Sequence, residues 1–447
     1  MRFRLVIVAL VVSALAPCGL AEEEKAPGQG RVVTTLAAGN ATGIFSDGDL
    51  VKAAATIVNE TDQNVSGRIV WEVTDDRLDQ RRLGYSRIRR VSRPGSPIKD
   101  VFEFDAVEDA PPGPGFIRFT CSFEPIQKEG AEPITGNKAS FRLGFEHEKI
   151  ESPLTREPDF DEFWAKTLDE LKTIEASFSA TPKPEKISAG HNVFELEMKS
   201  LGNLTIRGWL EVPKERKGPF PAVIRVPGYG QEMNPIGDAA PDGTIVLSLN
   251  IRGHGTSREN PESELQKDYW IRGLDAPSTY FYRGAYMDCV RAIDYLVTRE
   301  DVDPKRIAIT GGSQGGGLSL ATAALDGRIS ACAADVPFLL NWVNYFKETK
   351  WPEMDAWIAQ KEERTWESTL KNMSYFDVMN LADRIKCPVM VGIGLQDNIC
   401  PPSTIFATYN KLAGDKSYRI YQSAQHDLPA EHHRFRWEWL NSQTGSK

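Results

Sequence analysis

Apolar and polar residues alternate along the first third of the chain. In the clearest run, residues 117–123, apolar Ile, Phe, Cys and Phe are separated by polar residues, so the apolar side chains of a strand would share one face. Segments rich in turn-forming residues, at 64–67, 93–96 and 111–115, interrupt such runs. We therefore predict that residues 22–150 form a small antiparallel β-sandwich domain.

The periodicity then changes. Phe160, Trp164 and Leu171 recur at helical spacing, and strand-like runs afterwards alternate with helical ones, such as the helix expected at residues 285–297. This alternation predicts a doubly wound, mostly parallel sheet with helices on both faces, in an α/β domain over residues 151–447. The strand candidates are residues 194–199, 205–212, 222–226, 245–250, 306–310, 331–336, 389–395 and 418–421.

Residues 1–21 have the organisation of a secretory signal peptide. Arg2 and Arg4 form a basic start, residues 5–16 are an apolar run too short to span a bilayer, and small residues precede the cleavage site expected after Ala21. We therefore expect a secreted or periplasmic protein without a membrane span. The alternative is a lipoprotein, because Leu15-Ala16-Pro17-Cys18 resembles a lipobox, although proline fits poorly before the cysteine.

The composition is that of an ordinary globular protein. Among 447 residues, 53 Lys and Arg stand against 62 Asp and Glu, which gives a net charge of −9. Proteins that bind nucleic acid or anionic membranes normally carry the opposite charge, so we expect neither partner. Six cysteines in so long a chain do not form a disulfide scaffold, and we expect those beyond the signal peptide to be buried as small apolar side chains.

The strongest catalytic motif follows the strand candidate at residues 306–310. Gly311-Gly312-Ser313-Gln314-Gly315 contains Gly-x-Ser-x-Gly between a strand and a helix, the setting of a nucleophile elbow. Glycines are needed because a serine held at such a tight turn leaves no room for neighbouring side chains. The alternative is a glycine-rich loop that binds phosphate. We disfavour it because no lysine follows at the position such a loop requires and the sequence has no dinucleotide-binding fingerprint. We therefore expect Ser313 to be a nucleophile.

A serine nucleophile needs a base and an acid, which such sheets supply in the order serine, acid, histidine. Asp397 follows the strand candidate at residues 389–395, at its carboxyl end, and the alternative for it is a turn-forming aspartate. Of six histidines, His426 lies in a loop directly after the last strand candidate, so we expect it to be the base. His432 and His433 lie in a charged final helix, where we expect solvated side chains.

Two backbone N–H groups are expected to bind the oxyanion. One belongs to Gln314, directly after the nucleophile, and the other to Tyr229, in the loop that follows residues 222–226. Pro227-Gly228-Tyr229 is also an ordinary turn sequence, which is the alternative for that segment.

Together these residues resemble the acetyl xylan esterase and cephalosporin-C deacetylase family of α/β-hydrolases, over about two-thirds of the chain. The resemblance implies the α/β-hydrolase fold, Ser313 as nucleophile, Asp397 as acid, His426 as base, and Tyr229 and Gln314 as oxyanion donors. It implies no cofactor and no metal, and family members are often homo-oligomers. The blocks that carry it are Asp159-Phe160-Asp161-Glu162-Phe163-Trp164, Arg252-Gly253-His254-Gly255, Arg272-Gly273-Leu274-Asp275, Tyr282-Arg283-Gly284, Gly312-Ser313-Gln314-Gly315-Gly316, and Gly394-Leu395-Gln396-Asp397 followed by Cys400-Pro401-Pro402-Ser403-Thr404.

The chain departs from the family pattern at three positions. His254 stands where the family usually has glutamine, Pro227 where it has histidine, and Asp427 where it has glutamate. No catalytic group is removed, so these departures concern the substrate pocket. We expect Arg252 to be a structural ion-pair residue.

The sequence thus favours a secreted serine esterase, a carboxylic ester hydrolase that removes acetyl groups from acetylated oligosaccharides or other small acetyl esters through an acyl-enzyme intermediate. The alternatives are a serine peptidase of the same fold and a non-catalytic carbohydrate-binding protein. The β-sandwich carries no convergent set of His, Asp and Glu, so its role as scaffold, packing partner or glycan contact stays open, as do the sugar, the acyl-length limit and the oligomeric state.

Overall fold

The computed structural model describes residues 31–46, 48–76, 81–82, 88–105, 114–127, 130, 132–186, 188–214, 217–258, 268–349 and 351–445. The expected signal peptide, residues 1–21 with Cys18, lies outside the described residues.

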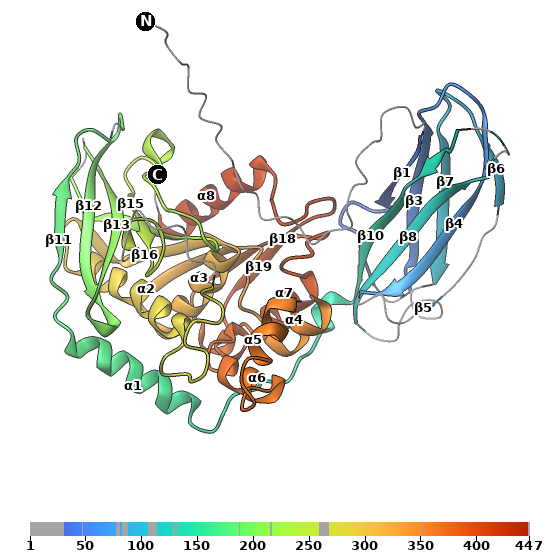
Figure 1. The fold of residues 1–447 in the computed structure, drawn as a ribbon. Coiled ribbons are helices and arrows are strands. Elements are labelled where there is room, and N and C mark those ends of the chain that lie inside the picture. The colour runs from blue at the N-terminus through green and yellow to red at the C-terminus, as the bar shows by residue number, and fades with distance from the viewer. Residues whose placement is uncertain are drawn as a thin grey trace, which may run out of the picture.

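The N-terminal part of the chain forms two sheets that pack face to face (Figure 1). One has the strand order β7-β3-β1-β9, the other β2-β10-β8-β4-β5 with β6 also paired to β4. Rings meet between the sheets, with Phe102 of β7 5.5 Å from Trp71 of β4 and 5.3 Å from Phe119 of β8. The strands are β1 (Arg31–Ala38), β2 (Ile44–Phe45), β3 (Leu50–Asn59), β4 (Val65–Asp75), β5 (Arg81–Arg82), β6 (Ile88–Ser92), β7 (Ile98–Asp105), β8 (Gly115–Pro125), β9 (Thr135–Gly136) and β10 (Lys138–Phe145).

Most pairs in this β-sandwich are antiparallel, as the alternating pattern predicts. The two exceptions among the described residues are parallel pairings of the two-residue strands, β9 with β1 and β2 with β10. Apolar residues of β8 point inward because successive side chains of a strand face opposite sides, and Phe119, Cys121 and Phe123 are fully buried.

The rest of the chain is built on a nine-stranded sheet of order β11-β12-β13-β15-β14-β16-β17-β18-β19. The first three strands are antiparallel, and β15 through β19 run parallel to one another, so the fold is that of an α/β-hydrolase, as predicted. The strands are β11 (Ser179–Pro182), β12 (His191–Ser200), β13 (Leu204–Pro213), β14 (Phe220–Val226), β15 (Ile245–Asn250), β16 (Val302–Gly312), β17 (Ile329–Asp335), β18 (Val389–Gly394) and β19 (Lys416–Tyr421).

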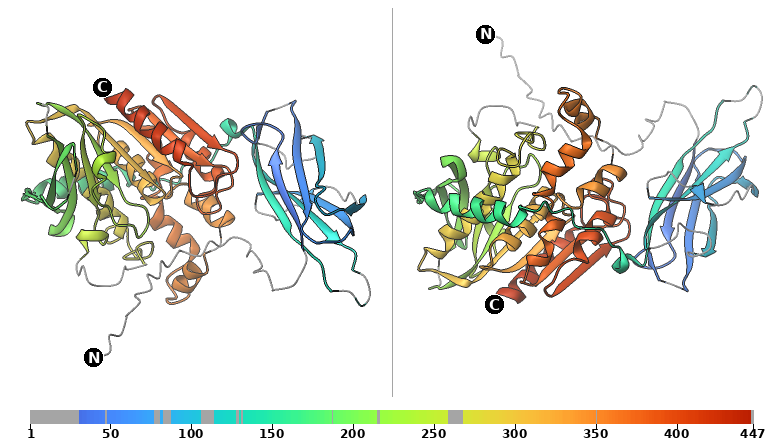
Figure 2. Two further views of the ribbon diagram at one scale, coloured as in Figure 1. Left: turned by 90° about the horizontal axis from the view of Figure 1, so that it is seen from above. Right: turned by 90° about the horizontal axis from the view of Figure 1, so that it is seen from below.

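Helices cover both faces of this sheet (Figures 1 and 2). Side chains alternate between the faces, so Ala308 of β16 packs with Leu440 of α8, while Ile309 faces the large core that includes α2 and α3. The α-helices are α1 (Phe160–Thr173), α2 (Phe281–Val297), α3 (Gln314–Leu325), α4 (Trp342–Glu348), α5 (Pro352–Ile358), α6 (Trp366–Ser374), α7 (Pro402–Tyr409) and α8 (Ala430–Thr444). Single-turn 3₁₀ helices span His147–Lys149, Leu201–Asn203, Gly237–Ala239, Gly255–Ser257, Val378–Asn380 and Ala382–Arg384.

Parallel strands bring distant segments to one edge of the sheet. Tyr229 follows β14, Ser313 follows β16, Asp397 follows β18 and His426 follows β19, so all four lie beyond carboxyl ends of parallel strands. The β-sandwich lies beside the β18–β19 side of the sheet in all three views (Figures 1 and 2).

Within the described part of the chain, no helix has the length and apolar character needed to cross a membrane. The five cysteines described there are free, and all are buried except Cys387, which is half-buried.

Candidate active site

Ser313 occupies a strained turn between β16 and α3. Its φ of 57° and ψ of −122° lie outside the regions favoured by side-chain-bearing residues. The neighbouring glycines permit the turn, because a Cβ on Gly315 would lie 2.5 Å from the Val226 carbonyl oxygen. A Cβ on Gly311 would lie 2.6 Å from the Gly315 carbonyl carbon. This is the geometry of a nucleophile elbow, with the serine at the N-terminus of a buried helix.

Asp397 and His426 are hydrogen-bonded to each other. Nδ1 of His426 lies 2.8 Å from Oδ2 of Asp397. The other carboxylate oxygen accepts the backbone N–H groups of Ile399 at 2.8 Å and Cys400 at 2.9 Å. The Asp397 side chain is fully buried, whereas that of His426 is 25% exposed. With Nδ1 directed at the carboxylate, Nε2 is the nitrogen left to exchange a proton with a nucleophile or with solvent.

Cys400 lies between these groups and the elbow. Its thiol is within hydrogen-bonding range of Ser313. Ligand-type atoms of Cys400, Asp397 and His426 all lie within 4.8 Å of one another. The structure therefore brings together the three residues that the sequence predicts as nucleophile, acid and base.

Among the described residues, one set has the spacing to hold a metal ion, and it consists of Asp397, Cys400 and His426. Their atoms are already engaged, because both oxygens of Asp397 accept hydrogen bonds and one of these pairs with His426. Burial also raises the pKa of the Cys400 thiol well above its usual value, which disfavours the thiolate that a metal needs. The arrangement fits an oriented imidazole better than a resident metal site.

The two expected oxyanion donors lie on neighbouring segments joined by His254. Gln314 is the first residue of α3, where backbone N–H groups have no acceptor within the helix. Nε2 of His254 accepts the N–H of Gly230 at 3.3 Å and lies 3.1 Å from the Gln314 side-chain amide nitrogen. Its Nδ1 lies 3.1 Å from the backbone oxygen of Arg252 and so donates to it.

His254 is fully buried, and burial lowers its pKa to about 4. It is therefore neutral near pH 7, which allows Nε2 to act as an acceptor. The Gln314 side chain is held further by the hydroxyl of Tyr282, at 2.9 Å. Sequence reasoning did not identify this bracing role. The one sequence feature that could have indicated this role is that His254 stands where the family usually has glutamine.

A cluster of aromatic rings connects the nucleophile elbow with the loop that carries Tyr229. The backbone oxygen of Ser313 accepts the N–H of Phe338 at 2.9 Å. The Phe338 ring stacks on Trp351 at 5.9 Å, and Trp351 meets Trp270 edge-on at 5.1 Å. The Tyr229 hydroxyl is within hydrogen-bonding range of the Trp270 backbone. We call Phe338, Trp351, Trp270 and Tyr229 the aromatic wall.

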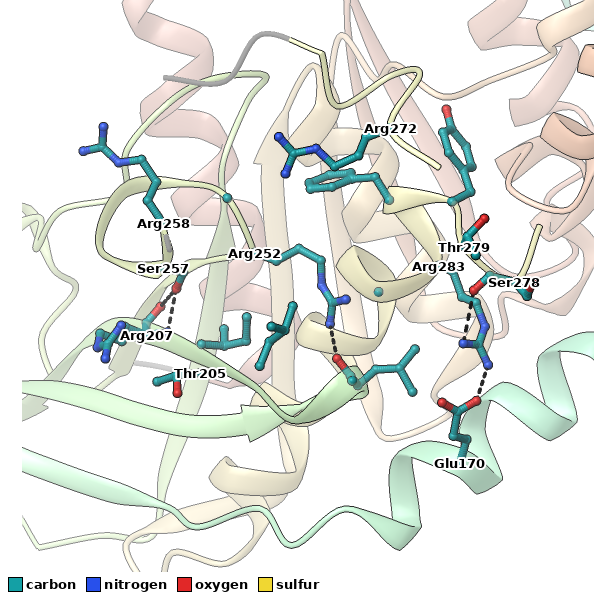
Figure 3. A pocket seen from close by; sticks show the side chains of 18 residues that line it. Glu170, Thr205, Arg207, Arg252, Ser257, Arg258, Arg272, Ser278, Thr279 and Arg283 are labelled. Carbon is teal, nitrogen blue, oxygen red and sulfur yellow. Dashed lines mark hydrogen bonds and ion pairs between the residues drawn. The ribbon is translucent and has the colours of Figure 1, made fainter. Parts of the chain in front are cut away.

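A separate cavity of about 700 Å³ is lined by residues that include Arg252 and Gly253, and the proposed nucleophile, acid and base do not line it (Figure 3). Its arginines are paired with acids. Arg252 forms an ion pair with buried Asp288 at 2.8 Å, as expected for a structural residue, and Arg283 pairs with Glu170 at 2.5 Å. The charges on these arginines are thus compensated, which weakens any case for an anion site.

One expectation about the histidines is wrong. His433 is exposed, but His432 is fully buried, with Nε2 2.7 Å from Asp335 and Nδ1 3.1 Å from the Tyr421 hydroxyl. The reason is that α8 packs on the sheet, so its inward face meets β17 instead of water. Asp335 with His432 is a second acid–imidazole pair, but its imidazole has no exposed surface.

Comparison with known proteins gives a consistent set of similarities. A family model described as acetyl xylan esterase (AXE1) matches residues 145–442. The chain is 33% identical over 318 residues to an acetyl esterase, Axe7A, of Xylanibacter ruminicola, covering 68% of this chain and 71% of that protein.

Two solved structures are similar over the same region. An acetyl xylan esterase from Paenibacillus sp. R4 has a TM-score of 0.61 and 30% identity, covering 66% of this chain and 98% of that one. Acetyl xylan esterase 1 from Thermoanaerobacterium sp. has a TM-score of 0.61 and 26% identity, covering 67% of this chain and 98% of that one.

Proposed function

The chain belongs to the acetyl xylan esterase family of α/β-hydrolases, and from that premise we propose that it is a secreted serine esterase that removes acetyl groups from acetylated carbohydrates. Membership of the family makes it a carboxylic ester hydrolase. The substrate class, the catalytic residues, the covalent intermediate and the export are parts of the proposal.

In the proposed reaction, Oγ of Ser313 attacks the acetyl carbonyl carbon while Nε2 of His426 takes its proton. Asp397 holds the imidazole in the required tautomer and stabilises its positive charge. Backbone N–H groups of Gln314 and Tyr229 stabilise the oxyanion, and each such donor contributes roughly 100- to 1,000-fold in kcat in comparable enzymes. His426 then gives this proton to the departing sugar oxygen as the bond between the acetyl carbon and that oxygen breaks, so the sugar leaves with a free hydroxyl.

The acetyl group is left on Ser313 as an ester. Water, deprotonated by the same imidazole, attacks this ester, and collapse of the second tetrahedral intermediate releases acetate and restores the serine. The observation that carries this mechanism is the 2.8 Å bond between the buried Asp397 carboxylate and His426, beside a serine held at a strained turn.

A carbohydrate acetyl ester is favoured by the surroundings of the serine. Trp351, the half-buried ring that stacks on Phe338, keeps part of its apolar surface exposed, and such a surface suits a sugar face and a small acyl group. The named relatives are an acetyl esterase and acetyl xylan esterases. Export is supported by the basic and apolar pattern of residues 1–21.

The test is acetate release over a panel of acetylated oligosaccharides, run beside a peptide panel and with a Ser313→Ala control. We expect release from several acetylated sugars, none from the control, and no peptide cleavage. Cleavage of peptides without release of acetate would replace the proposal with a peptidase. A chain that does neither and resists a fluorophosphonate probe would be a non-catalytic protein.

A further inference from the structure

The β-sandwich contacts the loop that carries Asp397 through one buried arginine. We infer that Arg142 of β10 is a positioning residue, which fixes that loop so that the Asp397 carboxylate stays aligned with His426. The inference rests on the proposed function, because it deepens the role given there to Asp397.

The guanidinium of Arg142 donates directly to the loop backbone. One terminal nitrogen lies 3.0 Å from the carbonyl oxygen of Leu395 and 2.7 Å from that of Asp397 itself. The other lies 3.1 Å from Oδ1 of Asn398. The Arg142 side chain is 2% exposed, so these bonds form away from competing water.

The arginine is itself held by the β-sandwich. Its Nε lies 2.8 Å from Oδ1 of Asp76, whose side chain is 8% exposed. Arg118 of β8 also pairs with Asp76, at 3.1 Å, and donates to Oδ1 of Asn398 at 2.7 Å. Two guanidiniums paired with one carboxylate therefore both donate hydrogen bonds to the loop that carries Asp397.

Gln396 ties the same loop to the backbone of β10 and to the segment before His426. Its Oε1 accepts the Arg142 N–H at 2.7 Å, and its Nε2 donates to the Arg142 carbonyl at 3.1 Å. Nε2 also lies 2.9 Å from the carbonyl of Gln422, which precedes the base in the next loop. Through Gln396, the loop that carries Asp397 and the segment before His426 are both linked to β10 of the β-sandwich.

These contacts matter because the carboxylate of Asp397 depends on its own loop for orientation. Besides its bond to His426, this carboxylate accepts the N–H groups of Ile399 and Cys400, two and three residues further along the chain. A movement of the loop by about 1 Å would stretch the 2.8 Å bond beyond hydrogen-bonding range, and misplacements of that size cost up to about 100-fold in rate.

Arg142 precedes the segment that the family model matches. The family model begins at residue 145, and the two similar esterase structures cover 66% and 67% of this chain while matching 98% of their own. The positioning contact is therefore contributed by the region that this chain adds to the hydrolase fold.

The test compares Arg142→Met, which keeps the apolar stem and loses every donor, with Arg142→Lys in the full chain. We expect Arg142→Met to lower kcat roughly 10- to 100-fold with KM nearly unchanged, because the substrate pocket is untouched. Arg142→Lys should recover part of the loss, since an ammonium still donates to the loop.

A double-mutant cycle separates positioning from general destabilisation. In an Asp397→Asn background, Arg142→Met should change the rate little further, because it acts through a carboxylate already removed. Ile69→Ala, which opens a cavity in the sandwich core, is the matched control and should lower the melting temperature while leaving kcat unchanged.

Each rate is measured twice, as acetate release and as the labelling rate of Ser313 by a fluorophosphonate. Wild-type protein that labels but releases no acetate would refute the proposed substrate, and the labelling rates would still test Arg142. A soluble Arg142→Met protein with wild-type rates, or equal losses in both backgrounds of the cycle, would overturn the positioning role.

Discussion

Protonation of His254 should destabilise the fold in a defined pH range. The side chain is fully buried, and its Nε2 accepts from Gly230 and faces the Gln314 amide, bonds that a protonated ring cannot form. Around it lie Asp288, which favours the charged form, and the uncharged rings of Tyr269 and Phe281. Burial outweighs Asp288, so the pKa of His254 falls to about 4 in the folded state.

The pH dependence of the free energy of unfolding follows from the difference in the pKa of His254 between the folded and the unfolded protein. An unfolded chain has an ordinary histidine pKa near 6.5, so between about pH 4 and 6.5 it binds more protons than the folded protein. The contribution of His254 to stability is complete above that range and is lost as pH falls through it. Between pH 7 and pH 5 the free energy of unfolding should fall by about 2 kcal/mol from this one group.

The measurement is urea unfolding at pH 7 and pH 5, followed by tryptophan fluorescence, since nine of the ten tryptophans lie beyond residue 150. His254→Gln is the comparison, because glutamine offers an acceptor and a donor and does not titrate. The wild type should lose about 2 kcal/mol more than His254→Gln between the two pH values. Equal losses in both proteins would refute the reasoning.

Two further predictions test the elbow and the substrate pocket. Gly315→Ala should destabilise the protein by about 1–3 kcal/mol in thermal or urea unfolding, because its Cβ would meet the Val226 carbonyl at 2.5 Å, whereas Gly327→Ala, with open space around it, should not. Across p-nitrophenyl esters, kcat/KM should fall steeply from acetyl to butyryl, because the proposed substrate is an acetyl ester and a pocket fitted to acetyl excludes longer chains. A pocket open to longer chains would instead gain about 0.8 kcal/mol per methylene, and a rate rising toward octanoyl would indicate a general carboxylesterase.

The sequence signals for the three proposed catalytic residues are local. Ser313 is marked by glycines that only a strained turn requires, and Asp397 and His426 each follow a recognisable strand. Parallel pairing then brings these loops to one edge, although they are far apart in the chain.

Contacts between packed units are harder to predict. Arg142 alternates with Phe141 and Leu143, which indicates a solvent-facing side chain, yet its face of β10 meets the Asp397 loop. His432 was expected in water for a similar reason, because charged residues surround it in α8. Periodicity tells which residues share a face, but not what that face packs against.

The central claim, that Ser313 is acetylated and deacetylated during turnover, is tested most directly by mass spectrometry of protein quenched while it hydrolyses an acetyl ester. We predict that the peptide containing Ser313 gains the mass of one acetyl group. Ser313→Ala should gain none and should release acetate several powers of ten more slowly while remaining folded. Wild-type protein without the adduct whose activity survives in Ser313→Ala would contradict the account.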